Sequence, residues 1–138
     1  MINADQIKKL KDMEKRNKII YWIATGLLAL GMLTSSLQQV FRQKDMNDMI
    51  VGLGYPLYFM AILGCWKILG VIAILIPRFK LLKEWAYAGF FFAMTGALVS
   101  HLACGDYDIK GIIGPLMQTV FIILSWYFRP VSRKIVLN

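Results

Sequence analysis

Hydrophobic residues along the chain gather in four long runs, and charged residues stand at the ends of these runs. The runs cover residues 19–41, 57–76, 85–104 and 109–128. Each is close to the roughly 20 residues with which a helix crosses about 30 Å of hydrocarbon. Backbone polar groups in lipid are satisfied only in helices and closed barrels, and no run alternates as barrel strands do. The pattern therefore predicts an all-α polytopic membrane protein, a bundle of four transmembrane helices.

Residues that break helices support these limits. Pro56 precedes the second run and Pro77 closes it. Gly105 follows the third run, and Pro130 follows the fourth. Pro115 falls within the first two turns of the fourth run, where it predicts either a kink or a later start of the helix.

Two segments outside the runs have helical patterns of their own. Residues 1–18 are rich in charge, and their apolar positions suit a short amphipathic helix at the membrane surface. Residues 42–56 lie between the first two runs, and their apolar spacing suits a short helix at the interface. We therefore divide the chain into a charged arm, residues 1–18, and a four-helix membrane domain, residues 19–138.

The placement of charge predicts the topology. Only 17% of the residues are charged, against about a quarter in soluble domains, so most of the surface is expected to face lipid. The formal net charge is +8, and most Lys and Arg residues stand in the arm, in residues 78–83 and in residues 129–134. Segments rich in Lys and Arg stay in the cytoplasm, so both termini are expected there. Topology accounts for the charge, and nucleic acid is not an expected partner.

The second run places Lys67 close to its middle. An ionisable residue at this depth is costly and by default marks a functional site. At about 1.5 Å per residue, Thr95 and Gln118 reach a similar depth, and other polar residues lie nearer the expected outer end. We expect a polar pocket that opens to the outer side. Its expected lining is Lys67, His101, Gln118, Thr95, Ser100, Gln39 and Asp106.

Each of these residues also has a plainer interpretation. Lys67 either binds an anion or polar head group, or forms a structural hydrogen bond to carbonyl groups and Gln118. His101 either carries protons near neutral pH or is an ordinary hydrogen-bonding residue at a helix end. Asp106 and Asp108 are the nearest acidic groups that could balance the charge of Lys67.

The sequence offers few residues for metal binding, disulfide chemistry or proton-coupled transport. A single histidine without a nearby Cys pair provides too few ligands, so no metal site is expected. Cys65 and Cys104 differ by roughly 12 Å in depth, beyond the about 7 Å limit on Cα separation for a disulfide. Both are expected to be buried packing residues rather than a redox pair. No span holds an Asp or Glu, which disfavours a proton-coupled exporter, and whether the chain is an enzyme stays open.

Several short motifs together resemble the DoxX-like family of small four-helix membrane proteins. They are the G-x-x-K of Gly64 and Lys67, the helix-ending Pro77, the E-W-A-Y-x-G of residues 84–89, and Ser100-His101 followed by Gly105 and Asp106. The similarity extends from about Tyr21 to Arg129. It implies the fold and a location in the cytoplasmic membrane of a bacterium. The wider superfamily includes a small subunit of thiosulfate:quinone oxidoreductase and animal chaperones for receptor assembly.

Two functions follow as hypotheses. In the first, the chain is an accessory or small-molecule-binding subunit of a membrane redox system, and the pocket holds a quinone or another lipid-soluble ligand. A hydrogen-bonding or cationic group beside a quinone carbonyl would stabilise the negative charge that develops on reduction. In the second, it is an assembly module without catalysis of its own, because polar groups hold helices together in lipid. The expected partners are the bilayer, a redox or other membrane subunit, and further copies of the chain.

Overall fold

The structure, a computed structural model, describes residues 1–137. It contains five α-helices and a final 3-10 turn, with no strand among these residues. The helices are α1 (Ala4–Val40), α2 (Lys44–Gly52), α3 (Leu57–Leu75), α4 (Lys80–Ala103) and α5 (Ile109–Tyr127), and the 3-10 turn is η1 (Val131–Arg133). The long helices α1, α3, α4 and α5 are each apolar enough to cross a membrane. The all-α architecture with four spans is therefore confirmed.

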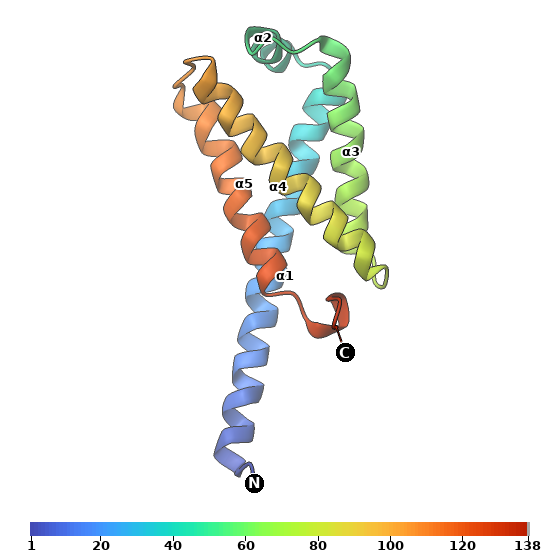
Figure 1. The fold of residues 1–138 in the computed structure, drawn as a ribbon, viewed down its shortest axis with the longest axis vertical. Helices are drawn as coiled ribbons and strands as arrows, with labels where there is room; N and C mark the ends of the chain where they lie inside the picture. Colours follow the sequence, from blue (N-terminus) through green and yellow to red (C-terminus); the bar gives the residue numbers. More distant parts are fainter. Residues whose placement is uncertain (138) are drawn as a thin grey trace.

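The four long helices form a ring. Helix α1 packs against α3 and α5, and α4 packs against the same two helices, so α1 and α4 lie opposite each other (Figure 1). The short helix α2 contacts α1 and α3 at one end of the bundle and buries Ile50. A short helix between the first two spans is thus confirmed.

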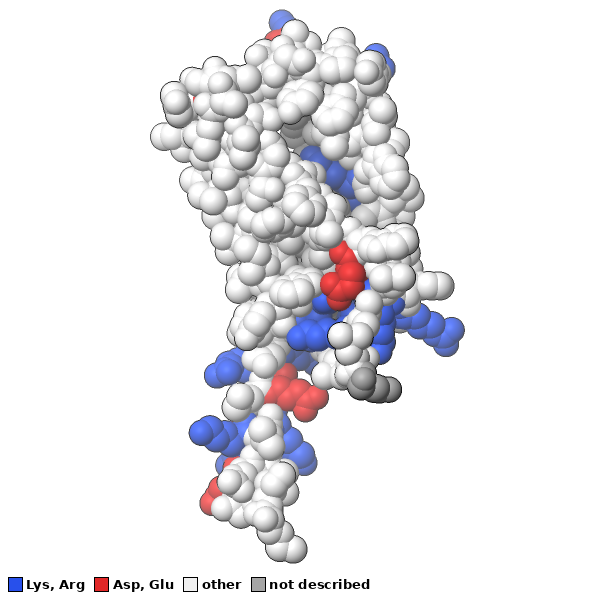
Figure 2. All heavy atoms as spheres, in the orientation of Figure 1, with Lys and Arg blue, Asp and Glu red and all other residues white. Residues whose placement is uncertain are grey.

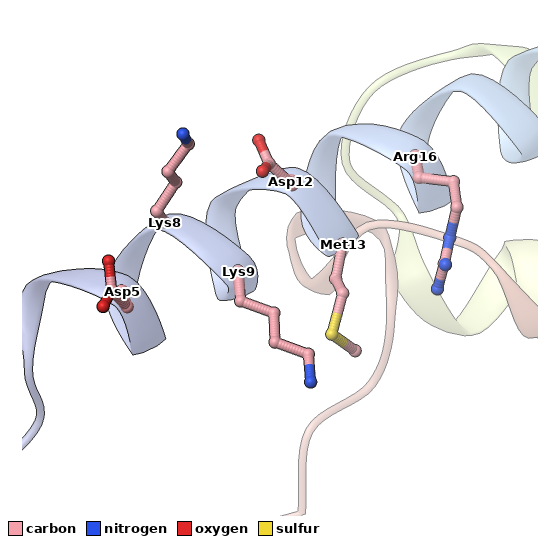
Figure 3. Close-up of a pocket in the computed structure, with 6 residues that line it drawn as sticks. All are labelled: Asp5, Lys8, Lys9, Asp12, Met13 and Arg16. Carbon is pink, nitrogen blue, oxygen red and sulfur yellow. The ribbon is translucent and has the colours of Figure 1, made fainter.

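Helix α1 is much longer than a bilayer is thick. Its 37 residues extend about 55 Å, so the charged arm is not a separate helix but continues α1 without a break. The arm projects beyond the rest of the bundle (Figure 1), and residues 1–16 are exposed. At its start, Asn3 and Gln6 form a capping box. The hollow along the arm offers no enclosed space, because the side chains that line it all come from one helix (Figure 3).

The two ends of the bundle differ in charge. The arm, the α3–α4 turn and the tail lie at one end, where Lys and Arg side chains gather (Figures 1 and 2). We call this the basic end, and we call the opposite end, with α2 and the α4–α5 loop, the α2 end. The prediction that the three basic segments share one side of the molecule is confirmed.

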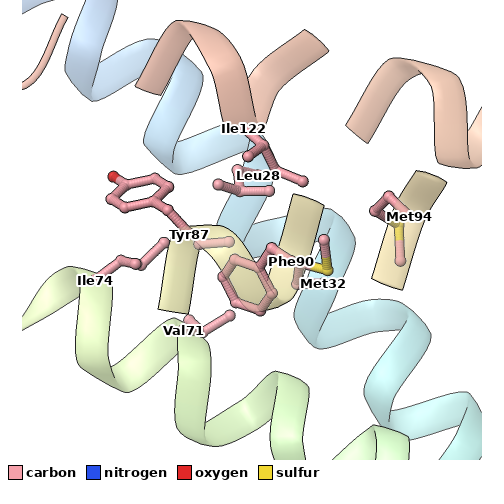
Figure 4. Close-up of a cluster of buried hydrophobic side chains, with 9 residues drawn as sticks. Leu28, Met32, Val71, Ile74, Tyr87, Phe90, Met94 and Ile122 are labelled. Atoms are coloured by element: carbon pink, nitrogen blue, oxygen red, sulfur yellow. The ribbon is translucent and has the colours of Figure 1, made fainter. Parts of the chain in front are cut away.

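A layer of apolar side chains fills the middle of the bundle (Figure 4). All four long helices contribute to it. Its members are Leu28, Ala29, Met32, Val71, Ile74, Tyr87, Phe90, Met94 and Ile122. On α1 this layer lies at residues 28–32, between the arm and Ser35.

Small residues allow some of the helices to approach closely. A Cβ atom on Gly70 would lie 2.6 Å from the Phe90 ring, and one on Gly64 would lie 2.8 Å from Val40. Gly31 is equally restricted, because a Cβ atom there would overlap the amide of Gln118. Gly26 of the same helix has no neighbour within 4 Å of an added Cβ atom, so it takes no part in this close packing.

Candidate functional site

Lys67 points into the bundle. Its side chain is 6% exposed, although it lies in the middle of α3. The amino group donates one hydrogen bond, to Ser35 Oγ of α1 at 3.3 Å. Neither of the two ion pairs found in residues 1–137 involves Lys67. A buried amino group with one long hydrogen bond keeps unused hydrogen-bonding capacity.

Two amide oxygens in the same part of the bundle also lack partners. Gln39 is 5% exposed, and its Oε1 atom is buried without a hydrogen bond. Gln118 of α5 is partly buried, and its Oε1 atom is likewise buried without a donor. Leaving such a group unpaired costs about 1–3 kcal/mol, so both oxygens are suited to accept from a water molecule or a ligand.

The spacing along α1 brings these groups together. Gly31, Ser35 and Gln39 follow each other at four-residue intervals and therefore share one face of the helix. Gln118 lies against Gly31, Lys67 bonds to Ser35, and Gln39 lies against Gly64 of α3. The polar groups thus lie within two turns of α1, where α1 faces α3 and α5. We call this group, Ser35, Gln39, Lys67 and Gln118, the polar chamber.

The surroundings of the polar chamber differ on its two sides. Toward the basic end, the apolar layer around Leu28 and Met32 closes the bundle (Figure 4). Toward the α2 end, the hydroxyl groups of Tyr55 and Ser100 form a hydrogen bond of 2.8 Å. Figure 2 shows a hollow between the two ends, surrounded by uncharged residues, with Lys or Arg atoms at its bottom.

Not all of the expected lining residues belong to the chamber. Thr95 donates to the Phe91 carbonyl of its own helix at 2.7 Å, which uses its hydroxyl hydrogen. Ser100 donates to the Gly96 carbonyl and pairs with Tyr55, which places it in the contact between α4 and the α2–α3 loop.

His101 and Asp106 form a pair of their own. His101 is 3% exposed, and its Nδ1 atom lies 2.9 Å from Asp106 Oδ2. The ring packs against Gly111, where a Cβ atom would come within 2.7 Å. Asp106 therefore pairs with His101 rather than with Lys67, and Asp108 caps α5 instead. The bond from His101 and the bond from the Asp108 amide hold the pKa of the Asp106 carboxyl below its usual range.

A second buried polar group lies nearer the basic end. Ser125 Oγ lies 2.6 Å from Thr25 Oγ1 and 2.7 Å from the Tyr87 hydroxyl, and all three side chains are buried. Tyr21 is fully buried as well. Tyr21 and Tyr87 thus both face the inside of the bundle. The signal in the sequence was Thr25 and Ser125, each inside an apolar run.

Basic side chains close the carboxyl end of α3. Lys83 has no exposed surface, and its amino group donates to the carbonyl groups of Ala73, Ile74 and Ile76. Arg133 donates to the Ile74 carbonyl at 3.0 Å. Cations at this helix end stabilise carbonyl groups that have no partner within the helix. Lys83 was counted only among the charges that set topology, so its buried role was missed.

The same network ties the tail to α4. Arg129, 4% exposed, pairs with Glu84 Oε1 at 2.5 Å, and its guanidinium lies over the Tyr87 ring. Trp126 donates to the other Glu84 oxygen at 2.9 Å. Beside this network, α4 and α5 leave an apolar groove of about 350 Å³ that contains Phe91, Phe92 and Ile123.

The two cysteines are free, but they are not buried. Cys65 and Cys104 are both exposed, so the expectation that they pack inside the bundle is wrong. Cys104 lies near the Leu53 carbonyl at 3.8 Å. In residues 1–137, no three His, Cys, Asp or Glu side chains gather as a metal site would require.

Comparison with known families agrees with this architecture. The model of the DoxX-like family matches residues 23–128, which is most of the chain, including most of the first span and all of the other three. No curated protein and no solved structure gives a significant match.

Proposed function

The chain belongs to the DoxX-like family, and we propose that it binds a lipid-soluble small molecule of the quinone type as an accessory subunit of a membrane redox system. The polar chamber is the binding site. Lys67 donates a hydrogen bond to an oxygen of the ligand head group, and Ser35 holds the amino group in place. The chamber is formed by residues of α1, α3 and α5. It offers polar contacts at the middle depth of the bundle, the depth at which a lipid-soluble ligand dissolves.

The buried amino group of Lys67, with a single hydrogen bond, carries this proposal. Placing such a group in an apolar interior is costly unless partners compensate it. A structural lysine looks different in this same chain, because Lys83 has several carbonyl partners. Lys67 lacks them, and a ligand oxygen would supply what is missing.

The test is ligand binding by the purified full chain in lipid nanodiscs. A decyl-substituted benzoquinone and its hydroquinone serve as probes, and calorimetry measures the Kd of each. Lys67→Met should weaken binding of both at least tenfold, because it removes the donor to the head group. Lys110→Met, at an exposed position at the start of α5, is the matched control and should bind as the wild type does. Binding that is unchanged in Lys67→Met would contradict the proposal.

The basic end also supports a location for the protein. We place the chain in the cytoplasmic membrane of a bacterium with both termini in the cytoplasm, because its Lys and Arg residues gather at that end (Figure 2). Protease should therefore cut the arm in inverted vesicles and leave it intact in right-side-out vesicles. The reverse pattern would contradict this orientation.

The projecting arm favours a second candidate, an assembly module. Residues 1–16 are exposed, and the arm extends as a helix away from the bundle (Figure 1). A helix in this position can contact another subunit. Crosslinking in cells should then recover a partner that is lost when Lys8, Lys9 and Lys11 are changed to Glu, with no effect of Lys67→Met. Recovery of the same partner from both variants would contradict this candidate.

A further inference from the structure

The unpaired oxygens of the polar chamber restrict the chemistry of its ligand. The Oε1 atoms of Gln39 and Gln118 are buried, and each lacks a donor. Amide oxygens only accept hydrogen bonds. A simple anion, or a head group with only carbonyl oxygens, would bind Lys67 but leave both amide oxygens unpaired. A ligand that brings donors would satisfy them and avoid that cost.

Lys67 adds the opposite requirement. Its amino group donates to the Ser35 hydroxyl group and to no backbone carbonyl group, whereas that of Lys83 donates to carbonyl groups at the end of α3. It needs an acceptor from the ligand. A hydroxyl group meets both needs, because its oxygen accepts from Lys67 while its hydrogen donates to Gln39 in the adjacent turn.

The positions of the two glutamine contacts along α1 suit a ligand with a second hydroxyl group. The Gln118 amide lies against Gly31, which is two turns of α1 from the backbone of Gln39. These two backbone positions are separated by roughly 12 Å along the helix axis. A six-membered ring with hydroxyl groups on opposite sides, and one hydrogen bond of about 2.8 Å at each end, extends over most of this distance.

We propose that the chamber prefers the reduced, dihydroxy form of its ligand, a hydroquinone, over the corresponding quinone. One hydroxyl group accepts from Lys67 and donates to Gln39, and the opposite hydroxyl group donates to Gln118. This inference rests on the proposed function, since it concerns the same site, and it names the form of the ligand that the site selects.

The experiment compares three probes on the full chain in nanodiscs. They are a decyl-substituted hydroquinone, kept reduced, the matching benzoquinone, and the hydroquinone with both hydroxyl groups methylated. The wild type should bind the hydroquinone at least tenfold more tightly than the quinone, because two buried acceptors are satisfied only by the former. The dimethyl ether, which has no donor, should bind no better than the quinone.

Variants connect the preference to the amide oxygens. Gln39→Met keeps the length of the side chain and removes the acceptor, so most of the preference for the hydroquinone should disappear. Gln38→Met, at the preceding position of α1, is the matched control and should keep the preference for the hydroquinone. Gln118→Met tests the other end of the ligand and should reduce the preference, so the result does not depend on one variant folding.

The outcomes separate this inference from the proposed function. Equal binding of hydroquinone and quinone by the wild type, or a preference that survives both Gln39→Met and Gln118→Met, would overturn the inference and leave a quinone-type site in place. Failure of the wild type to bind any of the three probes would overturn the proposed function together with the inference.

Discussion

Two buried lysines lie in the two halves of the bundle, and they have opposite surroundings. Lys83, near the basic end, donates to three carbonyl groups at the end of α3. Lys67, in the polar chamber, donates to a single serine hydroxyl. The comparison shows that burial alone does not identify a functional residue. What distinguishes them is whether the protein itself supplies the partners of the buried group.

The same contrast extends to the neighbouring polar groups. Near the basic end, Arg129 pairs with the Glu84 carboxylate, and Arg133 donates to the backbone of α3. The hydroxyl groups of Thr25 and Tyr87 both bond to Ser125. In the chamber, two amide oxygens remain without a donor. We infer that the basic half holds the helices together. In the chamber, hydrogen-bonding groups stay free at the cost of a lower free energy of unfolding.

The largest effect is expected for Lys83→Met. This change leaves the carbonyl groups at the end of α3 with fewer donors in a buried place, and it should lower the free energy of unfolding by about 3 kcal/mol. Thermal unfolding in detergent, followed by circular dichroism, measures the shift. Lys80→Met, at an exposed position in the same turn, should change stability by less than about 0.5 kcal/mol. Equal small shifts in both variants would remove the distinction between the two lysines.

Ser125→Ala should have the next largest effect. It takes the shared partner from the hydroxyl groups of Thr25 and Tyr87, which are both buried, and a loss of about 2 kcal/mol is expected. The same unfolding measurement applies, with the exposed Ser132→Ala as the control. If Ser125→Ala is as stable as the wild type, this buried polar group does not stabilise the basic half.

Much of the architecture could be predicted from the sequence, because hydrophobic length and breaker residues decide where helices cross a membrane. The four spans, the short helix α2 and the shared basic end follow from these patterns. Depth along the runs placed Gln118 level with Lys67 and Gln39 nearer the outer end. That these residues line a binding pocket stays a prediction.

Other features depend on which way each helix face turns, and depth does not give that direction. Tyr21 and Tyr87 lie at an interfacial depth, yet both face inward. Cys65 and Cys104 face outward. Asp106 was expected above Lys67, but the α4–α5 loop brings it to His101, five residues earlier in the chain. These contacts depend on helix rotation and loop conformation, which packing between distant segments determines.

The smallest effect concerns pH. The Asp106 pKa lies below its usual value in the folded protein, so its bond to His101 contributes fully above the unfolded pKa of about 3.9 and is lost as pH falls through the folded value. The difference in Tm between the wild type and Asp106→Asn should therefore shrink as the pH falls below about pH 5. A difference that grows below about pH 5 would contradict this assignment.

The contrast between the two lysines is tested most directly by the Tm of ligand-free Lys67→Met beside that of Lys83→Met, in the same detergent. The two substitutions should shift Tm in opposite directions. Lys67→Met should stabilise the bundle by about 1 kcal/mol, because it removes a buried amino group that has a single partner, while Lys83→Met should destabilise it. A loss of stability in Lys67→Met as large as that in Lys83→Met would show that Lys67 is a structural lysine, and would contradict the account.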